Sequence, residues 1–158
     1  MSYTFNTQHS KGKDAEQFIY EVFQPAFNVI PASKDLQKQG IDFTFTDRTN
    51  NAVHWVELKT DWTADRTGNA FIETISCDRE GKLGWAYTSQ ASWLLYFIPQ
   101  KKRIYRIAFD FLRLELSGWQ CYPEREIPNQ GKGGSYNTIG LLVPLAELQR
   151  IAQEVIEL

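Results

Sequence analysis

Two different spacings of hydrophobic residues follow each other in the first 60 residues. Between residues 11 and 24 the apolar positions recur at intervals of three and four, at Ala15, Phe18, Ile19, Val22 and Phe23. This spacing predicts an amphipathic helix, which Pro25 ends because proline cannot continue a helix. Residues 41–46 then alternate between apolar and polar, a pattern typical of a half-buried β-strand.

A turn-forming segment at residues 47–52 joins this strand to a second strand at residues 53–59, so the pair is predicted to be a hairpin. A two-residue turn at residues 50–51 places Asp42 opposite Lys59, whereas a turn centred on residues 49–50 places it opposite Glu57. Residues directly opposite in an antiparallel pair share a face. Both registers therefore put Asp42, Glu57 and Lys59 on one face of the sheet.

The apolar residues of the hairpin agree with this parity. Their predicted face is the other one, and its members are Ile41, Phe43, Phe45, Val56 and Leu58. A one-residue slip would bury the carboxylates and expose the phenylalanines, so that register is rejected.

The remaining pattern predicts an α/β domain spanning residues 1–158. Strands are expected at residues 70–76, 93–98, 103–107 and 138–143, with short helices at residues 84–92 and 110–116, the second closed by Gly118. Pro144 is expected to open a last helix, so that residues 138–157 form a C-terminal strand and helix. The apolar stripe of that helix comprises Leu148, Ile151, Ala152, Val155 and Ile156.

Two further acids lie near the predicted hairpin face. On a helical wheel Glu16 lies beside Phe23, at the rim of the apolar stripe, where a carboxylate can either face the sheet edge or remain in solvent. Glu73 shares a face with apolar neighbours of its strand, and is expected either to orient Lys59 or, by preference, to pair with an arginine. The hairpin pairing itself has a structural alternative, a simple cross-strand ion pair.

These elements together resemble the PD-(D/E)xK nuclease superfamily. The matching parts are the helix with Glu16, the strand start Gly40-Ile41-Asp42 and the run Glu57-Leu58-Lys59, within residues 11–110. Ile41 stands where the family name has proline, which leaves the aspartate in place. The resemblance implies a restriction-endonuclease-like core, with a mixed central β-sheet flanked by helices.

The resemblance also implies the chemistry of the site. Asp42, Glu57 and the backbone carbonyl of Leu58 would bind Mg²⁺, with Mn²⁺ able to substitute, and Glu16 would contribute directly or through a water molecule. Lys59 would hold and help to activate the attacking water and would offset the phosphate charge. Three carboxylates at one site would raise one another's pKa in the absence of a cation.

Composition limits the alternatives. The formal net charge is −2 and the pI is about 5.7, which argues against a strong non-specific nucleic-acid binder, so any DNA surface must come from local clusters. The chain has no apolar stretch long enough for a membrane span and no signal-peptide pattern. Its two cysteines, Cys77 and Cys121, are expected to be buried free thiols in a reducing, cytoplasmic setting.

Basic residues that short segments connect to the predicted site are the candidates for DNA contacts. They are Lys11, Lys13, Lys34, Lys38, Arg66 and, from a glycine-rich loop at residues 131–136, Lys132.

The sequence therefore predicts a Mg²⁺-dependent DNA endonuclease. Its subclass stays open among Holliday-junction resolvases and restriction, phage or mobile-element endonucleases. The alternative is a catalytically inactive nucleic-acid-binding or structural module that retains the nuclease fold. Because cutting two strands needs two active sites, a homodimer or a higher even oligomer is expected.

Overall fold

The computed structural model describes the backbone of residues 5–158 and the side chains of residues 11–158. Its helices are α1 (Phe5–Phe23), α2 (Lys34–Gln37), α3 (Ala64–Thr67), α4 (Trp85–Thr88), α5 (Phe109–Trp119) and α6 (Leu145–Ile151), with a 3₁₀ turn at Pro99–Lys101. Its strands are β1 (Phe27–Pro31), β2 (Phe43–Asp47), β3 (Val53–Thr60), β4 (Asn69–Cys77), β5 (Lys82–Leu83), β6 (Trp93–Ile98), β7 (Arg103–Ala108), β8 (Glu124–Gly131), β9 (Gly134–Pro144) and β10 (Glu154–Glu157).

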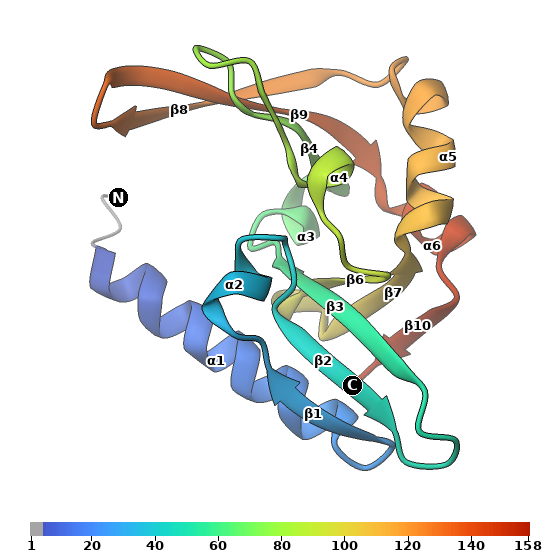
Figure 1. Ribbon diagram of the computed structural model, residues 1–158. Coiled ribbons are helices and arrows are strands. Elements are labelled where there is room, and N and C mark those ends of the chain that lie inside the picture. Colours follow the sequence, from blue (N-terminus) through green and yellow to red (C-terminus); the bar gives the residue numbers. More distant parts are fainter. Residues whose placement is uncertain (1–4) are drawn as a thin grey trace.

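These strands form two sheets (Figure 1). The central sheet has the order β1-β2-β3-β6-β7-β10; the β3–β6 pair is parallel and every other pair is antiparallel. The second sheet has the order β5-β4-β9-β8 and is antiparallel. The predicted α/β class, with a mixed central sheet flanked by helices, is confirmed.

Each face of the central sheet has its own hydrophobic core. Helix α1 covers one face, where Phe18 stacks on Phe97 at 5.0 Å between ring centroids and where Phe43, Phe45 and Val56 are buried. The other face packs against α4, α5, α6 and the second sheet. Glu57 and Lys59 belong to this second face, because they lie beside Leu94 and Tyr96 of β6.

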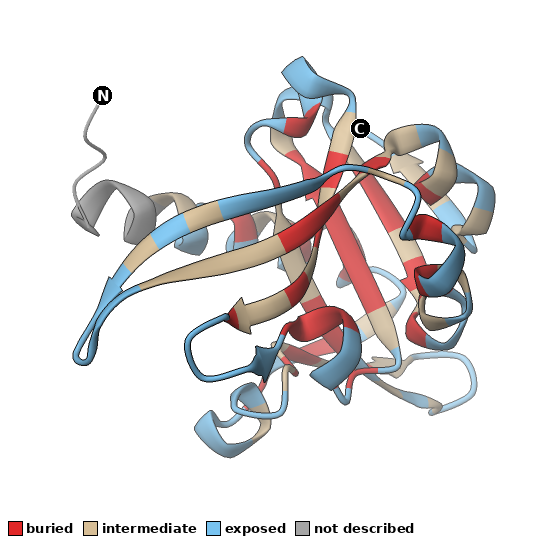
Figure 2. Ribbon diagram, turned by 90° about the horizontal axis from the view of Figure 1, so that it is seen from above, coloured by how far each residue is buried: buried red, intermediate tan, exposed pale blue. Residues whose placement is uncertain are grey.

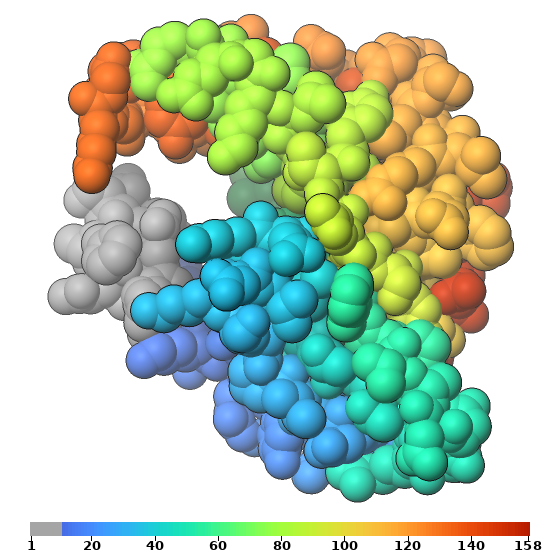
Figure 3. Space-filling model, viewed as in Figure 1, coloured from blue at the N-terminus to red at the C-terminus, as the bar shows by residue number. Residues whose placement is uncertain are grey.

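Strands β8 and β9 form a long hairpin that projects from the body of the molecule (Figure 2). Most of β8 is exposed or half-buried, and the hairpin closes with a two-residue turn at Lys132 and Gly133. The space-filling view shows a hollow between the hairpin tip and α2 (Figure 3). The glycine-rich loop predicted at residues 131–136 is thus the tip of this hairpin.

The hairpin register is the second of the two predicted, with Phe43 opposite Val56. Continued by one residue, this register places Asp42 opposite Glu57. The predicted face of Ile41 is wrong, since Ile41 is buried with the core on the other side of the sheet. The reason is that β2 begins only at Phe43, so strand alternation does not extend back to Ile41.

The C-terminal prediction is partly wrong. Helix α6 starts after Pro144 as expected but ends at Ile151, and Glu154–Glu157 forms an edge strand antiparallel to β7. Helix α5 also runs through Gly118 to Trp119 instead of stopping before it. None of the helices in residues 5–158 combines the length and apolar character that crossing a membrane requires.

Candidate active site

The β2–β3 hairpin brings Asp42, Glu57 and Lys59 together. Asp42 Oδ2 accepts a hydrogen bond from the backbone N–H of Leu58 at 2.7 Å. Lys59 Nζ lies 2.7 Å from Glu57 Oε1. The ammonium group therefore pairs with Glu57, two residues away on the same strand, and not with Asp42. The simple cross-strand ion pair between Asp42 and Lys59 does not form.

Glu57 is the most buried acid of the site, with 3% of its surface exposed. Burial raises the pKa of Glu57, and the nearby Asp42 carboxylate adds to this, while Lys59 and the Ser89 hydroxyl lower it. The Ser89 hydroxyl lies close enough to Glu57 to have this effect, but its single hydrogen is directed to the Gly40 carbonyl at 3.0 Å. Among the described residues, Glu57 Oε2 is a buried oxygen that accepts no hydrogen bond.

Asp42 is half-buried, and this burial raises its pKa against the lowering effects of the Leu58 N–H and the Lys59 ammonium. Leu58 lies beyond the last β2–β3 pair, so its N–H bonds to the carboxylate instead of to a strand. The C=O of a strand residue projects to the same edge as its own N–H. We infer that the Leu58 carbonyl points toward the Asp42 side of the site.

Glu73 approaches the same lysine from the second sheet. Its Oε1 accepts the backbone N–H of Trp85 at 3.3 Å, and Lys59 opposes the rise in the Glu73 pKa that burial causes. Trp85 lies under Lys59, whose Nζ is 5.6 Å from the ring centroid. The preferred prediction for Glu73 is wrong, because its partner is a backbone N–H and not an arginine.

The donor set fits a hard divalent cation. In the described part of the chain no three acidic, histidine or cysteine side chains gather closely enough to enclose a metal. Mg²⁺ does not need such a cage, since it is held by one or two carboxylates while water and substrate phosphate complete its coordination. The unpartnered Glu57 Oε2 beside Asp42 is the kind of oxygen that could serve as a ligand to such a cation.

Glu16 is exposed on α1, whose buried residues Ala15 and Ile19 pack on the opposite face of the sheet. None of the described interactions joins Glu16 to Asp42, Glu57 or Lys59. Its contribution to metal binding, directly or through water, stays a prediction.

The predicted DNA-contacting residues occupy several elements. Lys11 Nζ lies 5.0 Å from the ring centroid of Trp62, just beyond β3. Lys38 lines a cleft of about 350 Å³ that Glu73 and Trp85 also line. The other four are exposed, on α1, α2, α3 and the hairpin tip: Lys13, Lys34, Arg66 and Lys132.

A buried polar network beside the site has no counterpart in the sequence prediction. Tyr96 donates its hydroxyl hydrogen to Asp61 Oδ2 at 2.5 Å and accepts the backbone N–H of Phe71 at 2.9 Å. Asp61 Oδ1 accepts the N–H groups of Thr63 and Ala64 at the start of α3. The network ties β6 to β4, and its one sequence signal is a tyrosine within an otherwise apolar strand.

The roles of Ser89 and Trp85 were also missed, because the helix predicted at residues 84–92 gives no sign that either residue approaches Glu57 or Lys59. Cys77 is buried as predicted, but the prediction for Cys121 is wrong, since it is exposed.

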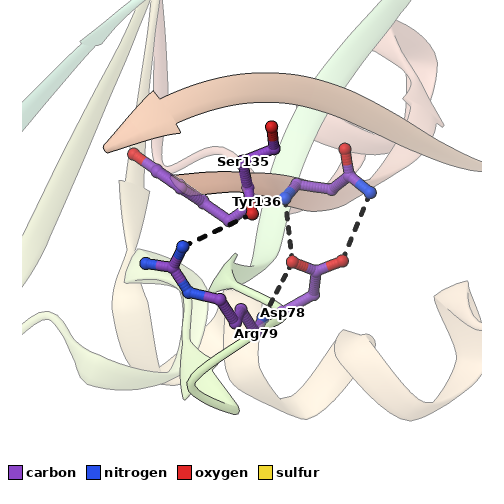
Figure 4. Close-up of a pocket in the computed structure, with 5 residues that line it drawn as sticks. Asp78, Arg79, Ser135 and Tyr136 are labelled. Atoms are coloured by element: carbon purple, nitrogen blue, oxygen red, sulfur yellow. Dashed lines mark hydrogen bonds between the residues drawn. The ribbon is translucent and has the colours of Figure 1, made fainter. Parts of the chain in front are cut away.

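A separate polar notch of about 300 Å³ lies beside the tip half of the β8–β9 hairpin (Figure 4). Asp78 accepts the backbone and side-chain N–H groups of Asn137 at 2.8 and 3.2 Å. Arg79 donates to the Ser135 carbonyl and lies over the Tyr136 ring. These contacts tie the turn after β4 to β9, so they brace the hairpin, and the notch is not part of the Asp42–Glu57–Lys59 site.

No known protein family, curated protein or solved structure matches this chain.

Proposed function

We propose that this protein is a Mg²⁺-dependent DNA endonuclease that hydrolyses phosphodiester bonds. The observation that carries the proposal is the buried Glu57 oxygen without a hydrogen-bond partner, on the same face as Asp42 and beside the Lys59 ammonium. A structural ion pair accounts for one Glu57 oxygen. It does not account for the second oxygen or for the burial of two carboxylates together.

Each residue has a distinct role in this proposal. Asp42, Glu57 and the Leu58 carbonyl hold the cation, and the Leu58 N–H fixes the Asp42 side chain. When bound, Mg²⁺ would lower the pKa of a water molecule that it coordinates and would offset the charge that develops on the phosphate. Lys59 orients the attacking water and adds a positive charge beside the scissile phosphate, while Trp85 limits where its ammonium can lie.

The Lys59–Glu57 ion pair is the observation that favours the alternative, a nucleic-acid-binding or structural module without catalysis. In that alternative Lys59 only neutralises a buried acid, and neither Mg²⁺ nor Mn²⁺ binds.

The number of active sites in one chain predicts the oligomeric state. One chain offers one Asp42–Glu57–Lys59 site, so cutting both strands of a duplex or of a four-way junction requires two copies. We expect a homodimer or higher even oligomer on DNA, with the Lys11/Lys13 and Lys34/Lys38 groups facing the substrate. Light scattering with DNA bound tests this assembly, and a strict monomer would instead favour cleavage of one strand.

The direct test is incubation with plasmid, linear and branched DNA in Mg²⁺, Mn²⁺ or EDTA. Cleavage with either metal and none in EDTA supports the nuclease. The relative rates on the three substrates identify the subclass. No cleavage of any substrate with either metal would favour the non-catalytic module.

A further inference from the structure

A cleft of about 320 Å³ opens between the two sheets next to the candidate active site. Lys59 lines it, so the cleft begins where the proposed chemistry would take place. Nine further residues line it, from the end of β3, the loop after it, β4, α4, β6 and β8. Four of these nine are aromatic, namely Trp62, Phe71, Trp85 and Tyr96, and Arg125 is basic.

The floor of the cleft is held rigidly. Burial, followed by the neighbouring Asp61 carboxylate, raises the pKa of Tyr96 well above its usual value, so its hydroxyl stays protonated and donates to Asp61. The same hydroxyl accepts the Phe71 N–H, which fixes the spacing of the two sheets. A site whose floor is fixed in advance loses little conformational freedom when a ligand binds.

The aromatic walls keep faces available to a ligand. Trp62 is 41% exposed although it lines the cleft, so part of its ring stays accessible to a ligand beside the Lys11 ammonium, which lies 5.0 Å from the ring centroid. The half-buried Phe71 ring lies against Gly140, where an added Cβ would come within 2.5 Å of the ring. Glycine at this position therefore lets the Phe71 ring pack against β9.

The charges around the cleft are complementary to a phosphate group. Lys59 and the exposed Arg125 line it, and Lys11 borders it through Trp62. Asp61 is the acid in the lining, and its oxygens are engaged by Tyr96 and by the backbone N–H groups of Thr63 and Ala64. Aromatic faces combined with basic groups are typical of sites that bind unpaired nucleotides.

We propose that this cleft binds one unpaired nucleotide of the strand to be cut, with its base against Trp62 and its phosphate toward Lys59. The inference rests on the proposed nuclease function and specifies its substrate class as single-stranded or locally unpaired DNA. The volume supports this choice, because about 320 Å³ lies near the lower limit of ligand clefts, roughly 300–1,000 Å³. Such a cleft has room for a single nucleotide.

The test measures DNA binding separately from cleavage. A labelled thymidine strand of about 12 nucleotides, within the usual site sizes for single strands, is titrated by fluorescence anisotropy with Ca²⁺ in place of Mg²⁺. The same strand annealed to its complement is titrated in parallel. The proteins are the wild type, Trp62→Ala, Trp62→Phe and Trp55→Ala. Trp55 is the matched control, because it is 42% exposed and lies outside the cleft.

The wild type is expected to bind the single strand more tightly than the duplex. Trp62→Ala should weaken single-strand binding roughly 5- to 150-fold, the range for losing one stacked base. Trp62→Phe should restore most of this loss, and Trp55→Ala should bind like the wild type. No binding by the wild type, tighter binding of the duplex, or equal binding by Trp62→Ala would each overturn the inference.

A cleavage assay in Mg²⁺ on the same four proteins distinguishes the two proposals. Duplex cleavage that Trp62→Ala leaves unchanged would refute the nucleotide cleft and leave the nuclease intact. The predicted binding pattern without cleavage in Mg²⁺ or Mn²⁺ would support the cleft and refute the nuclease.

Discussion

The carboxylate of Asp42 accepts the backbone N–H of Leu58 at 2.7 Å, so an acid takes the place of a strand partner at the end of the β2–β3 ladder. This bond holds Asp42 beside Glu57 without help from another side chain. Asparagine at position 42 would keep this hydrogen bond and lose the negative charge, because its amide oxygen can accept the same N–H.

Asp42→Asn is therefore expected to fold like the wild type but to lose Mg²⁺ affinity and cleavage together. Asp42→Ala should lose both and should also be less stable, by about 1–3 kcal/mol, because the Leu58 N–H loses its acceptor. Isothermal titration with Mg²⁺ and urea unfolding measure the two effects. Mg²⁺ affinity that persists in Asp42→Asn would remove Asp42 from the cation site.

The stability of the metal-free protein is expected to fall as the pH rises through the titration of Glu57. The folded pKa lies above the value of 4.5 for an exposed glutamate, so between these two pKa values only the folded state holds the proton. Glu57→Gln removes the Glu57 contribution and should raise the free energy of unfolding above that window, while Asp42 and Glu73, whose pKa values burial also raises, keep their contributions. Unfolding midpoints of both proteins across this pH range measure the difference.

The control for this pH effect is Glu124→Gln, which changes an exposed acid on β8. The free energy of unfolding of this variant should fall across the window in the same way as that of the wild type. Because only the ionised carboxylate binds a cation, Mg²⁺ affinity should rise with pH across the same window. A Glu57→Gln protein that keeps the wild-type pH dependence would show that Glu57 is not the responsible group.

Gly40 positions the segment that leads into Asp42. Its φ is +78°, and an added Cβ would lie 2.8 Å from Ser89 Oγ. Gly40→Ala is expected to destabilise the protein by at least about 1–2 kcal/mol, the cost of a left-handed conformation for an L-residue. Urea unfolding gives this value.

Gly12→Ala provides the matched control. Gly12 lies in α1 with no atom within 4 Å of an added Cβ, so the same substitution should stabilise the protein by about 0.5–1 kcal/mol. Equal effects at the two positions would contradict the constraint assigned to Gly40.

The hairpin was predictable because its strands alternate strictly, and one parity satisfies both the apolar and the acidic residues. The two possible turns differed in register but not in parity, so the shared face of Asp42, Glu57 and Lys59 did not depend on choosing between them. Ile41 was misplaced because alternation was continued to a position two residues before the strand begins at Phe43.

Other elements lacked a decisive pattern. Val155 and Ile156 fit a helical stripe as well as a strand, and only pairing with β7 decides for the strand. Strand β8 contains Pro128 and no buried residue, so it has almost no apolar signal. The Trp85 and Tyr96 contacts depend on how the second sheet packs against the first, which no local pattern encodes.

The central claim is that Lys59 acts in cleavage and not only as the ion-pair partner of Glu57. The most direct measurement is the rate at which supercoiled plasmid is nicked in Mg²⁺ by the wild type and by Lys59→Ala. Lys101→Ala, at an exposed turn, is the control, and EDTA is the blank. We expect a loss of about 100-fold or more for Lys59→Ala, the typical contribution of a group that assists proton transfer, with no loss for Lys101→Ala and no nicking in EDTA. Nicking by Lys59→Ala at the wild-type rate, or nicking that persists in EDTA, would contradict this claim.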